Sequence, residues 1–191
     1  MKHTLIPVAN HGITLSEVPG KTSVFIEVGL CRIHCRGCHS PHLTCKTCDL
    51  YTDEQVERLI DSYRKNYPVI STVVFMGGLH NTGVDRDAFR SLIERIHLPV
   101  AVYSGQDEDL EELLEWKNLQ YIKTGSYVAK LGGLEENTSN QHFYEKHKTM
   151  VFDRFCCYDH TEYWWEDKTH LFRKRKEDTV AQYPNKRTNS N

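Results

Sequence analysis

The chain has 191 residues, of which 39% are hydrophobic and 26% are charged, and its formal net charge at pH 7 is -2. This composition is typical of a soluble globular protein, and the length suits a single domain with its own core. We expect a cytoplasmic protein with no nucleic-acid or membrane partner, because the net charge is slightly negative, no apolar run approaches a membrane helix in length, and Met1–Asn10 lacks the apolar stretch of a signal peptide.

Predicted strands and helices alternate through the first half of the chain. Thr22–Val28 is rich in β-branched and aromatic residues, which favours a strand. Thr52–Gln55 has the pattern of a capping box, so we expect a helix to begin there with its apolar side chains on one face. Val69–Phe75 is short and largely apolar, as in a sheet covered on both faces. Asp85 is expected to cap a second helix, which ends before Pro99.

The alternation continues as far as Gly125 and then weakens. Val100–Tyr103 predicts a third strand. Asp107–Lys117 predicts a third helix with acidic residues in its first turn and a solvated acidic face. Leu119–Lys123 predicts a fourth strand, and Leu131–Tyr144 a long polar loop.

The last part of the chain carries weaker patterns. Thr149–Phe155 predicts one further strand. The aromatic run Tyr163–Trp165 is expected to pack over the core. The basic run Arg173–Lys176 is expected to be solvated, and Pro184–Asn191 to be a disordered tail.

Strands that alternate with helices predict a parallel sheet with right-handed crossovers. In such sheets the functional groups gather at the carboxyl ends of the strands. Each predicted strand end carries cysteine, glycine or both, in the segments Gly29–Cys38, Met76–Gly78, Ser104–Gly105 and Lys123–Gly125. We therefore expect the cysteines and the glycines to share one edge of the sheet.

The chain has seven cysteines, and five of them lie between Cys31 and Cys48. Without an export signal, this clustering favours metal or redox chemistry over a disulfide framework. Cys31, Cys35 and Cys38 have the spacing C-x3-C-x2-C and provide three thiolates. An iron–sulfur cubane usually takes four cysteine ligands. A cubane held by three keeps one iron open for another ligand, as a reactive cluster requires.

A zinc site is the alternative interpretation of these cysteines. Cys35 and Cys38 form one C-x2-C knuckle, and Cys45 and Cys48 form a second, so the four thiolates could hold zinc in a non-catalytic zinc-ribbon module. That interpretation leaves Cys31 without a role. We favour the cluster, and the zinc site remains open.

The second knuckle has two interpretations of its own. Cys45 and Cys48 are either plain loop thiols or an auxiliary zinc or cluster site. Such a site would be completed by Cys156 and Cys157 or by a nearby histidine. The spacing alone does not choose between them.

The C-x3-C-x2-C motif directly after the first predicted strand resembles the cluster motif of the radical S-adenosylmethionine superfamily. Met76-Gly77-Gly78 stands where the superfamily has a Gly-Gly-Glu or Gly-Gly-Asp motif, although Leu79 replaces the acid. The resemblance implies an α/β fold, a partial, open (β/α) barrel over residues 1–155 with a short aromatic C-terminal extension over residues 156–191. It also implies a 4Fe-4S cluster and S-adenosylmethionine as cofactors.

Longer segments resemble one family within it, the activating proteins of anaerobic (class III) ribonucleotide reductase. Gly29–Ser40 resembles the family's cluster loop, and Tyr121–Tyr127, Leu131–Leu134 and Thr138–Tyr144 resemble its closing segment. The resemblance implies an oxidoreductase that reductively cleaves S-adenosylmethionine to a 5′-deoxyadenosyl radical and generates a glycyl radical on the reductase. The implied partners are the large reductase subunit and a low-potential electron donor such as flavodoxin.

The same resemblance assigns residues. Cys31, Cys35 and Cys38 would be the cluster ligands and the catalytic residues. The residues that would contact S-adenosylmethionine are Gly37, Cys38, His39, Met76, Gly77, Gly78 and Ser104. An alternative keeps the cofactors but changes the target, as in a pyruvate formate-lyase-type activase or a deazapurine synthase. The closing segment argues against that alternative.

Overall fold

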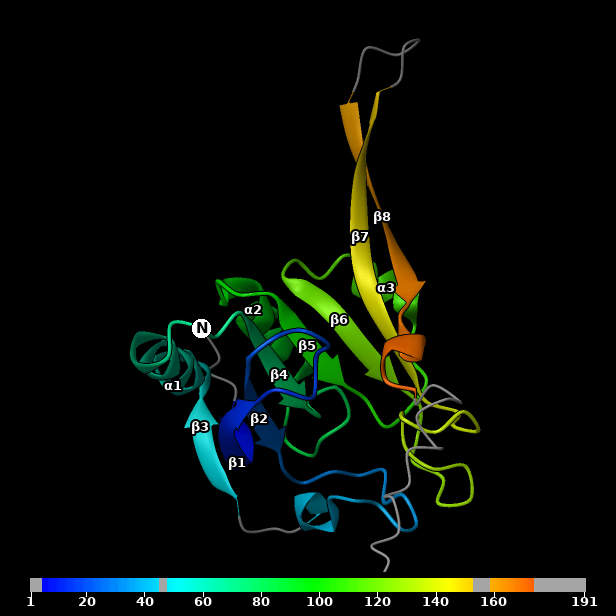
Figure 1. Cartoon of the computed structure of the whole chain (residues 1–191). Coiled ribbons are helices and arrows are strands. Elements are labelled where there is room, and N and C mark those ends of the chain that lie inside the picture. The colour runs from blue at the N-terminus through cyan, green and yellow to red at the C-terminus, as the bar shows by residue number, and fades with distance from the viewer. Residues whose placement is uncertain (1–4, 45–47, 153–158, 174–191) are drawn as a thin grey trace, which may run out of the picture.

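The computed structural model describes residues 5–44, 48–152 and 159–173. Figure 1 shows the order of the elements, whose bounds are β1 (Leu5–Thr14), β2 (Ser23–Val28), η1 (Pro41–Thr44), β3 (Asp49–Thr52), α1 (Asp53–Asn66), β4 (Thr72–Met76), α2 (Arg86–Arg95), β5 (Val100–Tyr103), α3 (Leu110–Leu114), β6 (Leu119–Thr124), β7 (His142–Phe152), β8 (Asp159–Asp167) and η2 (Thr169–Leu171).

An eight-stranded sheet organises the described residues, with the strand order β3-β1-β2-β4-β5-β6-β7-β8. The central strands β2, β4, β5 and β6 run parallel. β1 and β3 at one side, and β7 and β8 at the other, are antiparallel to their neighbours. Because β3 and β8 are separate edges, the sheet is not closed. The structure confirms an α/β fold with a parallel centre.

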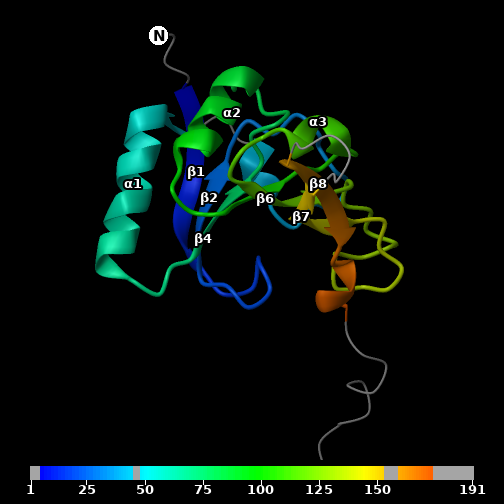
Figure 2. The same cartoon turned by 90° about the horizontal axis from the view of Figure 1, so that it is seen from above.

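The three α-helices cover one face of this sheet (Figure 2). The predicted capping box begins α1, because the Thr52 hydroxyl accepts the Gln55 N–H and the Gln55 side chain accepts the Thr52 N–H. Val56 and Ile60 of α1 pack in the core that also contains Phe89 of α2. Burying each such side chain contributes about 1.5–3 kcal/mol relative to its exposure to water.

Loops cover the opposite face of the sheet. Val74 of β4, Ala101 of β5 and Phe143 of β7 form a second apolar cluster there. Val18 from the β1–β2 connection and Leu134 from the loop before β7 complete it. The central strands are therefore buried on both faces, which explains why their sequences are continuously apolar rather than alternating.

The first strands differ from the prediction at two points. β4 begins at Thr72 rather than Val69. The residues before it form a turn, because the Ile70 N–H donates to the Tyr67 carbonyl. In this turn the Val69 residue is 69% exposed. β1 and β3 were not predicted. Their sequences lack a regular alternation, and pairing with β2 and with each other holds them in place.

The third helix is shorter than predicted and covers Leu110–Leu114 rather than Asp107–Lys117. Its start is set by Asp109, whose carboxylate accepts the N–H groups of Glu111 and Glu112. An N-cap residue lies outside the helix that it caps. Asp107 and Glu108 consequently belong to the loop after β5, and this places Glu108 near the strand ends.

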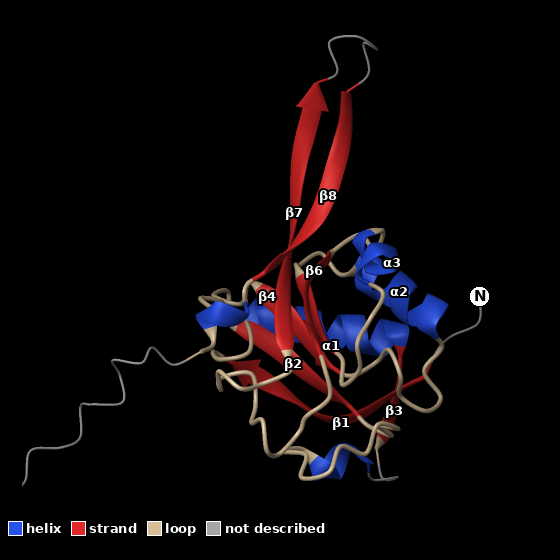
Figure 3. Ribbon diagram, turned by 90° about the vertical axis from the view of Figure 1, so that its right-hand side faces the viewer, coloured by secondary structure: helices blue, strands red, loops and turns tan. Residues whose placement is uncertain are grey.

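The last two strands form a long hairpin that rises beyond the rest of the sheet (Figures 1 and 3). β7 begins at His142, within the predicted loop, and β8 was not predicted. The aromatic run divides between core and solvent. Trp165 packs on the core and donates its indole N–H to the Leu110 carbonyl at 2.7 Å, whereas Tyr163 and Trp164 are 49% and 44% exposed.

Three predicted features fall wholly or partly outside the described residues. They are the end of the predicted strand at residues 153–155, the basic run after Arg173 and the tail Pro184–Asn191. The resemblance places the barrel at residues 1–155 and the C-terminal extension at residues 156–191. β7 lies before this boundary and β8 after it, and the two strands pair with each other. In the described ranges, no helix combines the length and the apolar character needed to cross a membrane.

Lys146 of β7 connects the hairpin to the end of α3 through hydrogen bonds. Its ammonium group donates to the carbonyls of Leu114 and Trp116, at 3.3 and 2.6 Å, where α3 ends. The same group lies 5.8 Å from the ring centre of Tyr163 and 5.7 Å from that of Trp165. Burial lowers the pKa of Lys146 to about 8, and Glu94 opposes part of this shift.

We predict that the stability of the wild type relative to Lys146→Met rises with pH between about 8 and 9.5. In this range the unfolded chain keeps the proton on Lys146 while the folded chain loses it, so raising the pH favours the folded state. Denaturant unfolding of both proteins at several pH values measures the difference. A difference that is flat or falls with pH would contradict the prediction.

Candidate functional site

The carboxyl ends of the parallel strands meet around one cavity with a volume of about 180 Å³. Cys31, Cys35 and Cys38 line it from the loop after β2, as the sequence predicted for this edge. The other strand ends contribute Met76, Gly77, Leu79, His80, Asn81, Tyr103, Ser104, Gly105 and Lys123. We call this space the site cavity.

Three of the predicted residues do not line the site cavity. The His39 ring packs against Tyr127, with 4.4 Å between ring centres, and Tyr127 itself lines the cavity. Gly37 lies beside Ala129, whose Cβ would be 3.3 Å from a Cβ at position 37. Gly78 lies behind Gly77 against the Phe89 ring. The contact residues predicted from the resemblance are thus only partly gathered around the cavity.

The cysteine loop is held by its backbone. Leu30 and His34 have φ angles of 56° and 50°, in the left-handed region that residues with a Cβ rarely adopt. The Cys31 N–H donates to the Leu43 carbonyl at 2.8 Å, and the Cys38 N–H donates to the Cys35 carbonyl at 3.1 Å. These turns bring three thiols of intermediate exposure to one cavity, and none of the three is in a disulfide.

The arrangement of the three thiols is compatible with a cluster. Among the described residues, no three His, Cys, Asp or Glu side chains converge closely enough to hold one metal ion. A zinc ion requires every sulfur at about 2.3 Å from one centre. In a cubane each thiolate binds its own iron, so the sulfurs stand farther apart. Three thiols around a shared cavity fit that arrangement.

The second cysteine knuckle is described only in part. Cys48 lies against Gly29, where its sulfur occupies the space that a Cβ at position 29 would need. Cys45, Cys156 and Cys157 lie outside the described residues. The auxiliary metal site therefore stays a prediction.

Asn81 joins the glycine turn to the cysteine loop, and sequence reasoning missed it. Its amide nitrogen donates to the carbonyls of Val28 and Gly29, at 2.8 and 2.7 Å. Its amide oxygen accepts the Gly78 N–H at 2.7 Å. Gly77 and Gly78 have φ angles of 107° and 112°, so the turn requires glycine. An asparagine three residues after a glycine pair was the available signal for such a turn.

Leu79, which stands where the motif that this segment resembles has an acid, is 8% exposed and belongs to the core. A carboxylate reaches this region from elsewhere. The side chain of Glu108 is 4% exposed and lies 2.6 Å from His80 Nε2. It also accepts the hydroxyl proton of Ser104, whose oxygen accepts the Gln106 N–H at 3.1 Å. The prediction of a wholly solvated acidic face is wrong at Glu108, because the helix starts after it.

Lys123 brings a positive charge to the thiols. Burial lowers the pKa of Lys123 to about 8, and the nearby Cys35, Cys38 and Glu17 oppose part of this shift. The ammonium group donates to the Gly125 carbonyl at 3.2 Å. Lys123 therefore lies close enough to Cys35 and Cys38 to interact electrostatically with both side chains.

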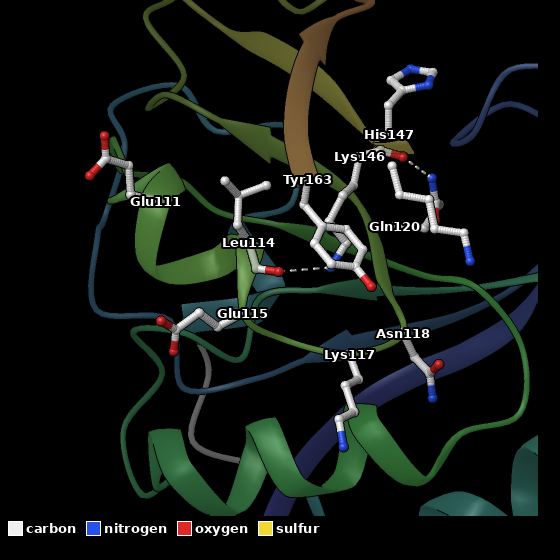
Figure 4. Close-up of a pocket in the computed structure, with 10 residues that line it drawn as sticks. Glu111, Leu114, Glu115, Lys117, Asn118, Gln120, Lys146, His147 and Tyr163 are labelled. Carbon is white, nitrogen blue, oxygen red and sulfur yellow. Dashed lines mark hydrogen bonds between the residues drawn. The ribbon is translucent and has the colours of Figure 1, made fainter. Parts of the chain in front are cut away.

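A second cavity, with a volume of about 1050 Å³, lies beneath the β7–β8 hairpin (Figure 4). Figure 4 shows Lys146 donating to the Leu114 carbonyl, and Gln120 donating to the Lys146 carbonyl. No cysteine among the described residues lines this cavity. Its buried cation has a structural role, so we place the candidate chemistry in the site cavity.

Comparison with known families agrees with that placement. Residues 19–122 match the model of a family described as a 4Fe-4S single cluster domain. The match spans more than half of the 191 residues, and it contains the whole cysteine loop and the glycine turn. Neither the search of curated proteins nor the search of solved structures found a match.

We predict that Asn81→Ala lowers the free energy of unfolding by about 2–3 kcal/mol, because the buried carbonyls of Val28 and Gly29 and the Gly78 N–H lose their partner. Denaturant unfolding measures the change. The exposed Asn137 provides the matched control, and Asn137→Ala is expected to change stability by less than about 0.5 kcal/mol. Equal effects of the two substitutions would contradict the role of Asn81.

Proposed function

The chain belongs to the 4Fe-4S single cluster domain family, and from this premise we propose that it is a radical S-adenosylmethionine activase of anaerobic ribonucleotide reductase. The observation that carries the proposal is the gathering of three thiols and a glycine turn around one cavity, at the carboxyl edge of an open, parallel-centred sheet. In this proposal the sheet is a partial (β/α) barrel.

The chemistry divides between the bound groups and the chain. When bound, the 4Fe-4S cluster supplies one electron and an open iron position to S-adenosylmethionine. In the proposed reaction that electron would break the C5′–S bond and release methionine, and the resulting 5′-deoxyadenosyl radical would take a hydrogen atom from a glycine of the large reductase subunit. The products are 5′-deoxyadenosine and a glycyl radical. A low-potential donor such as flavodoxin replaces the electron.

The chain's own residues hold and orient these groups. Cys31, Cys35 and Cys38 are the proposed cluster ligands, and Lys123 offsets part of their negative charge. Gly77 lines the site cavity, and its lack of a side chain leaves room for the Asn81 amide beside its backbone. Met76 lines the site cavity beside this turn. The Ser104 hydroxyl proton is already donated to Glu108, which leaves its oxygen as an acceptor toward a ligand.

We predict opposite effects of two cysteine substitutions on metal content. Cys31→Ala abolishes iron and sulfide incorporation during anaerobic reconstitution, and Cys48→Ala retains both. A four-cysteine zinc site built on Cys35, Cys38, Cys45 and Cys48 demands the reverse, with zinc kept in Cys31→Ala and lost in Cys48→Ala. Iron, sulfide and zinc analysis with visible absorption measures both variants. A colourless wild-type protein that contains only zinc would overturn the proposal.

We predict that the reduced, reconstituted protein cleaves S-adenosylmethionine and leaves a glycyl radical on the large subunit of the reductase. Chromatography of 5′-deoxyadenosine measures the cleavage, and electron paramagnetic resonance measures the glycyl doublet. Cleavage without a doublet would reject the reductase as target and favour another glycyl-radical enzyme or a small molecule. The absence of cleavage by protein with a full cluster would reject the activase altogether.

A further inference from the structure

The proposed chemistry gives no role to the buried carboxylate of Glu108. With 4% of its side chain exposed, this carboxylate requires hydrogen-bond donors or opposite charges around it. Ser104 donates its hydroxyl to it, and His80 Nε2 lies 2.6 Å away. Arg86 lies farther off, at 3.7 Å, and pairs more closely with Glu112 at 3.0 Å. Glu108 is therefore held mainly by Ser104 and His80.

Both of these partners line the site cavity, and Glu108 lies behind them. Ser104 has one proton, and it is donated to Glu108. The side chain of His80 is 32% exposed, so the imidazole ring is accessible to a ligand. In the sequence, His80 lies two residues after Gly78 of the glycine turn.

Glu108 fixes the tautomer of His80. A carboxylate can only accept, so the proton on the imidazole must be on Nε2. A neutral imidazole with its proton on Nε2 has a lone pair on Nδ1. Within the described residues, Nδ1 has no hydrogen-bond partner of its own. In the neutral form of His80, Nδ1 is thus an acceptor on a side chain that lines the site cavity and is held in place by Glu108.

We infer that His80, oriented by Glu108, binds the nucleoside ligand of the site cavity by accepting a hydrogen bond at Nδ1. This inference rests on the proposed function, because it takes S-adenosylmethionine as that ligand. The donor is the methionyl amino group or a ribose hydroxyl, and the two belong to different halves of the molecule. Glu108 is a positioning residue in this arrangement and touches no ligand.

Calorimetric binding of S-adenosylmethionine to the reconstituted, unreduced protein tests the inference without any turnover. His80→Ala is expected to weaken binding about tenfold, the effect of one well-placed hydrogen bond. The exposed His97 supplies the matched control, and His97→Ala is expected to bind like the wild type. Iron content and the denaturation midpoint, measured for each variant, establish that cluster and fold are intact.

Two replacements of similar shape separate the ring nitrogens, and they also serve if His80→Ala fails to fold. His80→Asn keeps an acceptor near the position of Nδ1, and His80→Gln keeps a donor near Nε2 but has no acceptor at Nδ1. We expect His80→Asn to bind S-adenosylmethionine more tightly than His80→Gln does. The reverse order would overturn the assignment of Nδ1.

A double-mutant cycle tests the role of Glu108. Glu108→Gln removes the charge that fixes the tautomer, so it is expected to weaken binding in the wild type and to have no further effect in His80→Ala. Equal effects in both backgrounds would show that Glu108 acts independently of His80.

Two fragments of the ligand identify the donor. If it is a ribose hydroxyl, His80→Ala weakens binding of 5′-deoxyadenosine, and if it is the amino group, it weakens binding of methionine. Wild-type protein that binds S-adenosylmethionine while His80→Ala binds it equally well overturns the inference alone. Wild-type protein that holds the cluster but binds no S-adenosylmethionine overturns the proposed function and the inference together.

Discussion

The site depends on the side-chain amide of Asn81, which holds the turn after β4 against the end of β2. Its three hydrogen bonds reach Val28, Gly29 and Gly78, so the amide joins two loops that leave neighbouring parallel strands. The cysteine loop begins directly after Gly29, and the Leu30 carbonyl accepts the Thr82 N–H beside the same amide. The distance between the thiols and the glycine turn is thus set by buried hydrogen bonds, which cost free energy if either partner is removed.

Charge in the site cavity is arranged in two opposed groups. Lys123 lies near Cys35 and Cys38, and Glu108 lies behind His80 and Ser104. Burial alone disfavours both charges, as the lowered pKa of Lys123 shows. Each charge persists because opposite charges or hydrogen-bond donors face it. The site cavity therefore has a lysine beside its thiols on one side, and a carboxylate that orients an imidazole on the other.

Local sequence signals predicted the parallel centre of the fold and the edge that bears the cysteines. The capping box at Thr52 and the glycines of the turn act within a few residues, so their meaning is visible in sequence. The contacts of Asn81 with Val28 and of His80 with Glu108 join residues 53 and 28 positions apart, and no local pattern encodes them. Of the β7–β8 hairpin only a strand at Thr149–Phe155 was predicted, and the rest was missed for a different reason. β8 mixes charged residues with the adjacent Trp164 and Trp165, and Tyr163 and Trp164 are exposed, so no alternation of apolar and polar residues marks it as a strand.

The open sheet bears on the size of the proposed substrate. The site cavity has a volume of about 180 Å³, and the thiols and the glycine turn share its walls. A protein of the size of a reductase subunit cannot enter such a space, so only a loop that carries the target glycine could approach it. Because β3 and β8 do not pair within the described residues, the sheet leaves a gap where a closed barrel would have a wall. An extended loop needs such a gap, whereas a small-molecule substrate does not. The open sheet is therefore compatible with the proposed macromolecular target at the point where it departs from a closed barrel.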